Sequence, residues 1–168
     1  MRKIPWVILC LLPFIVSGQI IVDRPLSPRL TGYDINVTLD PERHIVSGQM
    51  NAWWVNHSSM PVGEAMMHMY LNAFSSNKST FTARGRWSAA GEDGWGWVKI
   101  NSIIDGKGND LIDSIGFVSP DDGNEYDKTV LRIALPAPVS SGDTLFLAID
   151  LTSKLPSPIQ RTGYEDDF

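Results

Sequence analysis

Apolar and polar residues alternate along residues 33–39, YDINVTL. Neighbouring side chains of a strand point to opposite faces, so this pattern predicts a half-buried strand. Its apolar face would hold Tyr33, Ile35, Val37 and Leu39. Residues 40–44 form a predicted turn with Pro41 at a favoured position, and residues 45–58 a long second strand. The two strands would make a hairpin, with a bulge or bend at Gly48.

The rest of the chain continues as short apolar runs between turn signals. Residues 64–72, EAMMHMYLN, fit a buried strand or a short helix, and we favour the strand. A loop or short helical turn over 73–81 and a surface loop over 84–94 follow. The remaining strands are expected at 95–103, 111–118, 128–135 and 144–151, separated by turns or loops at 105–110, 119–127 and 136–143. About seven strands and no convincing amphipathic helix predict an all-β fold, either a sandwich or a strongly curved antiparallel sheet.

Length and charge narrow the class of protein. The 168 residues, 43% of them hydrophobic, suit one domain with a real core plus a targeting segment. The formal net charge is −5, and lysines and arginines form no basic run. This argues against nucleic acid as a partner, because that function needs a basic face for the phosphates.

The first 18 residues have the pattern of a secretory signal peptide. A basic start, MRK, precedes the apolar run IPWVILCLLPFIV, which is too short to span a membrane. We expect cleavage before Gln19, and therefore export to the periplasm, the cell surface or the medium. The alternative is an uncleaved anchor, which Pro5 and Pro13 disfavour. Residues 19–32 would form an extended leader, and residues 33–168 the domain.

The single cysteine, Cys10, lies inside this apolar run. Lipidation requires a cysteine at the end of such a run, so we do not expect it here. After cleavage the chain would have no cysteine, and therefore no disulfide, thiol nucleophile or thiolate metal site. Its stability would then depend on the hydrophobic core.

Residues with catalytic or metal-binding chemistry are scattered. None of His44, His57 and His68 begins an H-E-x-x-H motif, and for His68 we expect a hydrogen-bonded position within or beside the core. Glu64 has no activating neighbour in the sequence. Two acidic turns, 105–110 and 119–127, lack the regular spacing of a calcium loop; the second contains Asp121, Asp122, Glu125 and Asp127. We therefore assign no catalytic, cofactor-binding or metal-ligating residue to this chain.

Tryptophans offer a different kind of site. Trp53 and Trp54 are neighbours on a predicted strand, so one should be buried and the other should face outward or into a second layer. Trp95 and Trp97 would share a face, and an exposed aromatic row could stack on sugar rings. Core or interface packing is the interpretation we favour. Glycosylation sequons occur at Asn36, Asn56 and Asn77.

Several segments, read in order, resemble the first domain of aminopeptidase N-type zinc metallopeptidases (gluzincins). YDINVTLDPERHIVSGQMNAWWVNHS resembles the opening of that domain, with its LDP turn. MHMYLNAFSSNKSTF is similar to the LHLYPNAF strand of the bacterial branch. DKTVLRIALPAPVSSGDTLFLAIDLTSKLP is similar to the closing pair of strands, and the resemblance covers residues 33–168.

This resemblance implies a saddle-shaped β-domain that packs against a catalytic metallopeptidase domain and walls its peptide substrate cleft. The zinc, its H-E-x-x-H motif and the G-x-M-E-N segment would belong to that other domain, in the same or a neighbouring polypeptide. GEAMM (63–67) does not match G-x-M-E-N, so no catalytic residue is carried over. The chain would be a fragment that ends before the catalytic domain and is inactive alone. The alternative function is a free-standing secreted carbohydrate-binding or adhesion sandwich.

Overall fold

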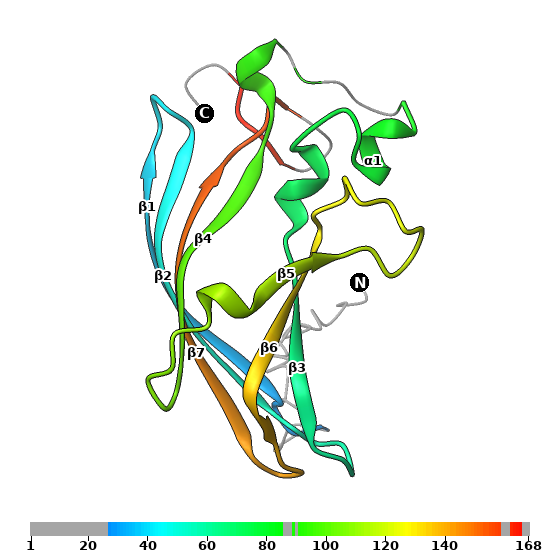
Figure 1. The fold of residues 1–168 in the computed structure, drawn as a ribbon. Coiled ribbons are helices and arrows are strands. Elements are labelled where there is room, and N and C mark those ends of the chain that lie inside the picture. The colour runs from blue at the N-terminus through cyan, green and yellow to red at the C-terminus, as the bar shows by residue number, and fades with distance from the viewer. Residues whose placement is uncertain (1–26, 86–88, 90, 159–161, 166–168) are drawn as a thin grey trace, which may run out of the picture.

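Two antiparallel sheets face each other in the computed structural model, which describes residues 27–85, 89, 91–158 and 162–165 (Figure 1). In the described chain, sheet A has the strand order β1-β2-β7-β4 and sheet B the order β3-β6-β5. The strands are β1 (Thr31–Asp40), β2 (Ile45–Val55), β3 (Val62–His68), β4 (Trp97–Asp105), β5 (Ile115–Val118), β6 (Val130–Val139) and β7 (Thr144–Lys154). The prediction of an all-β, sandwich-like fold is confirmed.

Helical segments are short in the described part of the chain. They are α1 (Thr80–Ala83) and the 3-10 turns η1 (Tyr70–Phe74), η2 (Glu92–Gly94) and η3 (Ile112–Ser114). Ser79 caps α1, because its side chain accepts a hydrogen bond from the Thr82 backbone N–H. None of these helices combines the length and the apolar character that crossing a membrane would require.

The predicted hairpin of β1 and β2 is present, and of the bulge or bend predicted at Gly48 the bulge is absent. Val37 pairs with Gly48, and the register of β1 with β2 runs from end to end without a shift. Gly48 has a φ of +155°, and a Cβ there would meet the Asn36 carbonyl and lie 2.7 Å from Val37 Cα. Glycine is therefore needed because the backbone of β1 passes unusually close.

Several strand boundaries differ from the sequence prediction. β1 begins at Thr31, inside the predicted leader. β3 ends at His68, so the last residues of the strand predicted over 64–72 belong to η1 instead. The chain turns here because the buried Asn72 side chain forms hydrogen bonds with segments distant in the sequence. β6 continues to Val139, which pairs with Val62, so half of the predicted loop over 136–143 is strand.

The core lies between the two sheets, at their overlap. It is a cluster of buried apolar side chains from both sheets and from the η1 and η3 connections: Met50, Met69, Ile103, Leu111, Leu131, Ile133, Leu145, Leu147 and Ile149. β7 contributes every second residue to it, Leu145, Leu147 and Ile149, as the pleat of a strand requires. We call the side of sheet A that points toward this core its inner face.

Two buried asparagines connect the sheets through hydrogen bonds. Asn72 accepts from the Val98 N–H at 2.7 Å and donates to the Lys128 carbonyl at 2.9 Å. Asn56 donates to the Val139 carbonyl at 2.9 Å and to the Met60 carbonyl at 2.8 Å. Bonds of this kind fix the relative position of the sheets, because a buried amide left without partners is costly.

The predicted signal peptide (1–18), with Cys10, and most of the predicted leader (19–26) lie outside the described residues.

Candidate functional site

The three histidines lie apart from one another in the structure. His44 is half-buried in the β1–β2 turn and stacks on Tyr164, with ring centroids 3.4 Å apart. His57 is exposed after β2. The position expected for His68 is wrong: it lies on the exposed side of β3 and stacks on Tyr70, with ring centroids 5.1 Å apart. Among the described residues, no three His, Cys, Asp or Glu side chains gather in a group that could hold a metal ion.

The acidic turn over 119–127 is tied to α1. Asp122 Oδ2 accepts a hydrogen bond from the Thr80 hydroxyl at 2.7 Å, and Asp127 Oδ2 accepts one from the Thr80 N–H at 3.1 Å. The Thr80 hydroxyl bond, followed by the backbone bond from Asn124, lowers the pKa of Asp122. Burial alone would raise the pKa of Asp127, but hydrogen bonds from Thr129 and Thr80 outweigh it and lower that pKa. These carboxylates have a structural role as acceptors.

Two other carboxylates from the sequence analysis, those of Glu64 and Asp105, also have partners. Glu64 on β3 forms an ion pair with Arg132 on β6, on the exposed side of sheet B. Asp105 accepts hydrogen bonds from the Lys107 and Asn109 backbones and from the Asn109 side chain, and these bonds lower its pKa. The turn predicted over 105–110 is confirmed.

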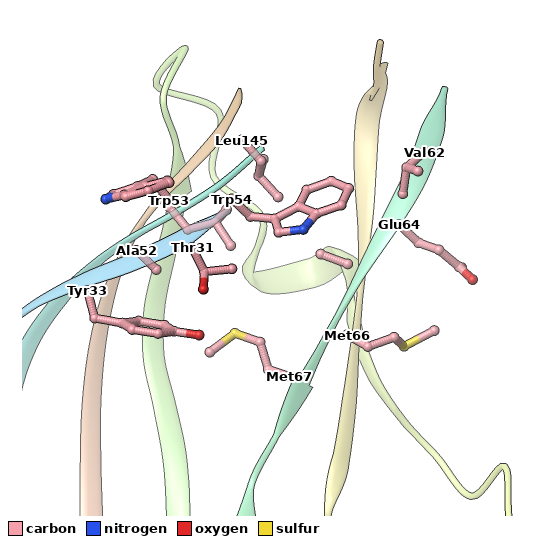
Figure 2. Close-up of a pocket in the computed structure, with 12 residues that line it drawn as sticks. Thr31, Tyr33, Ala52, Trp53, Trp54, Val62, Glu64, Met66, Met67 and Leu145 are labelled. Carbon is pink, nitrogen blue, oxygen red and sulfur yellow. The ribbon is translucent and has the colours of Figure 1, made fainter. Parts of the chain in front are cut away.

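The four tryptophans that the structure describes do not form an exposed row. Trp54 faces the core from β2, and its neighbour Trp53 points to the opposite side, where its indole lies against Gly32 (Figure 2). The prediction that Trp53 and Trp54 occupy opposite faces is confirmed. Trp97 is the first residue of β4 and Trp95 precedes it, outside the strand that was predicted to hold both. Both side chains are half-buried.

The sequons differ in accessibility. Asn56 is fully buried, and its Oδ1 accepts from both the backbone and the hydroxyl of Ser58. Its amide is therefore inaccessible to a glycosylating enzyme in the folded state. Asn36, on the outer face of β1, and Asn77, in a turn before α1, are exposed.

The inner face of sheet A is covered at one edge and open at the other. One row of paired residues crosses the whole sheet, from Ile35 through Met50 and Ile149 to Ile103. The exposed fraction falls along this row: 57%, 9%, 1% and 0%. Sheet B therefore covers β7 and β4 but leaves β1 uncovered.

Every apolar side chain that β1 places on the inner face is exposed. We call these four residues the β1 row: Tyr33, Ile35, Val37 and Leu39, which are 64%, 57%, 44% and 55% exposed. The sequence pattern correctly predicted that these four side chains share one face of the strand. The prediction that this face is buried is wrong. An apolar surface of this kind commonly marks an interaction site.

A cavity of about 340 Å³ adjoins the β1 row, between β1 and β2 of sheet A and β3 of sheet B. Figure 2 shows Tyr33, Trp54 and Met67 directed into this space from the two sheets, whereas Glu64 and Met66 point away from it. We call it the edge cavity, because β1 and β3 are the edge strands on the same open side of the two sheets. No sequence pattern indicates this cavity, because its walls come from segments that are distant in the chain.

No protein-family model matches this chain, and no curated protein matches it either.

Proposed function

We propose that this chain is a non-catalytic β-domain that packs against a second polypeptide domain. The observation that carries this proposal is the exposure of the β1 row, Tyr33 to Leu39 on alternate positions, beside an otherwise well-buried core. Burying apolar surface stabilises an assembly by roughly 25 cal/mol for each Å² removed from water. A continuous apolar row on a strand is thus a favourable contact for another domain.

We infer the kind of second domain from the resemblance to the first domain of aminopeptidase N-type zinc metallopeptidases. In that arrangement the chain packs against a catalytic metallopeptidase domain and forms one wall of a peptide substrate cleft. The described residues of this chain do not fit a zinc ion, because they bring no three ligand side chains together. In this proposal the zinc and the peptide chemistry belong to the partner domain, and no catalytic step is assigned to residues of this chain.

The alternative function, a secreted carbohydrate-binding or adhesion sandwich, has less support. It relies on an exposed row of indoles for stacking on sugar rings. Trp95 and Trp97 are half-buried and do not share a strand. A saturable change of tryptophan fluorescence with a glycan would favour it nevertheless.

Two measurements test the proposed function. The first reads the native transcript past the codon for Phe168: an open frame with H-E-x-x-H and a later Glu is expected, and an immediate stop codon would overturn the aminopeptidase assignment. The second mixes the purified chain with zinc and an amino-acid arylamide. No hydrolysis is expected, and hydrolysis that a chelator abolishes would contradict a non-catalytic role.

A further inference from the structure

We propose that the free edge of β1 binds an extended segment of another polypeptide as an added strand, apolar on its inner side and carrying Lys or Arg on its outer side. This deepens the proposed function and rests on it, because both require a second polypeptide at the same edge of sheet A. Strand addition of this kind joins two chains through backbone hydrogen bonds, and side-chain pockets select the sequence.

β1 has the properties of an unprotected edge. Among the described residues only β2 pairs with it, over all ten residues of Thr31–Asp40 and without a register shift. The strand contains no proline and no lysine, and it has no bulge. Natural proteins commonly use these features to block pairing at edge strands. The edge is therefore long and regular enough to accept another strand.

The direction of the free backbone groups follows from one hydrogen bond. The Val55 N–H donates to the Leu30 carbonyl at 2.8 Å, just before β1 begins. In an antiparallel pair, successive residues alternate between bonding to the neighbouring strand and pointing away from it. The even-numbered residues of β1 thus bond to β2, and the N–H and C=O groups of the odd-numbered residues, Thr31 to Leu39, face the open side.

The side chains at this edge favour an apolar inner side on the added strand. Side chains of the added strand on that side would lie next to the β1 row, since directly opposed residues have Cβ atoms about 4.5–5.5 Å apart. At the Tyr33 end they would adjoin the edge cavity, where Trp54 and Met67 provide apolar walls (Figure 2). An added strand would extend sheet A beside β1, and its inner side chains would shield one side of the exposed β1 row.

The negative charge on the outer face of β1 favours a different polypeptide over a second copy of this chain as the partner. The outer face of β1 carries Asp34 and Asp40. Asp34 has no ion pair with any described residue, and Asp40 has a 4.0 Å contact with the exposed Arg43. A second copy of β1 would add two more carboxylates to this face, where like charges oppose pairing. Lys or Arg on the added strand would complement both aspartates, so we commit to a different polypeptide.

The test uses the full chain and a fluorescent peptide of alternating Val and Lys, about eight residues long, within the usual length of a strand. Fluorescence anisotropy should show saturable binding. Two peptides serve as controls: one has Glu in place of each Lys, and the other has Pro in place of alternate residues, which removes backbone N–H donors. Both controls should bind at least about tenfold more weakly.

Variants of the chain then locate the site. Ile35→Lys places a charge in the β1 row and should weaken binding of the Val-Lys peptide at least about tenfold. The matched control is Ile104→Lys, at an exposed isoleucine of β4, the opposite edge strand; it should leave binding unchanged. Circular dichroism and a urea midpoint establish that both variants fold.

Three results with the peptides and the variants would overturn the inference. They are absence of saturable binding, equal binding of either control peptide, and equal loss in both variants. A dimer of the full chain that Ile35→Lys converts to a monomer would also overturn it, because the occupant would then be a second copy. Binding of the Val-Lys peptide together with a transcript that lacks the zinc motif would retain the inference and reject the aminopeptidase assignment.

Discussion

Ile35 and Ile103 lie in the same cross-strand row of sheet A, on its two edge strands, yet Ile35 is 57% exposed and Ile103 is fully buried. Both point to the inner face. The difference arises from sheet B, which covers β4 and does not reach β1. This contrast links the fold to the proposed function, because the uncovered end of the row is where the proposed partner would bind.

The two isoleucines should respond very differently to truncation. Ile103→Ala leaves a cavity in the core and should lower the free energy of unfolding by about 2–5 kcal/mol. Ile35→Ala removes an exposed side chain and should cost less than about 1 kcal/mol. Urea denaturation of both variants measures this. Similar losses would mean that β1 is covered in the isolated chain.

Replacing Asn56 should destabilise the protein, because this residue is fully buried although it directly follows the last residue of β2. Asn56→Ala loses the bonds to the Met60 and Val139 carbonyls and leaves buried polar groups without partners. We expect a loss of about 1–3 kcal/mol in the free energy of unfolding. Asn36→Ala, at an exposed sequon, is the matched control and should change it by less than about 0.5 kcal/mol. Equal effects would contradict the bonding described for Asn56.

Gly48→Ala should be strongly destabilising. The new Cβ would meet the Asn36 carbonyl at a φ that L-residues rarely adopt, so β1 and β2 could not keep their present distance. The loss should exceed about 1 kcal/mol. Gly116→Ala on β5 is the control, since a Cβ there meets nothing within 4 Å. A neutral Gly48→Ala, measured by thermal unfolding, would contradict the close approach of β1.

Acid should destabilise the contact between α1 and the turn over 119–127. The pKa of Asp127 is lowered below 3.8 in the folded state. Its ionised form therefore stabilises the fold fully above the unfolded pKa of about 3.9, and this contribution is lost as the pH falls through the folded value. Asp127→Asn should reduce the loss of stability below about pH 4.

Urea midpoints of the wild type and Asp127→Asn, measured from about pH 6 down to about pH 2.5, test this expectation. Asp121→Asn, in the same turn, is the control and should keep the wild-type dependence on pH. An Asp127→Asn profile that parallels the wild type would show that this carboxylate does not contribute.

Much of the local structure followed from the sequence. The alternation in 33–39, the apolar run of 144–151 and the Gly, Asn and Asp residues of 105–110 identified two strands and a turn where the structure has them. Boundaries were less accurate where a single buried side chain ends a strand, as Asn72 does after β3. A polar residue in an apolar run gives no sign of the long-range bonds it will make.

The sequence by itself determined the all-β class, the β1–β2 hairpin and which residues share a face, because the two-residue period of a strand is a local property. Only the tertiary structure decided which of those faces are covered. The pattern of β1 resembles that of β7, yet Ile149 is in the core and Ile35 is not. Burial depends on how far the opposing sheet extends, and that is set by contacts between segments distant in the sequence. The candidate binding edge is therefore a property of the assembled sheets.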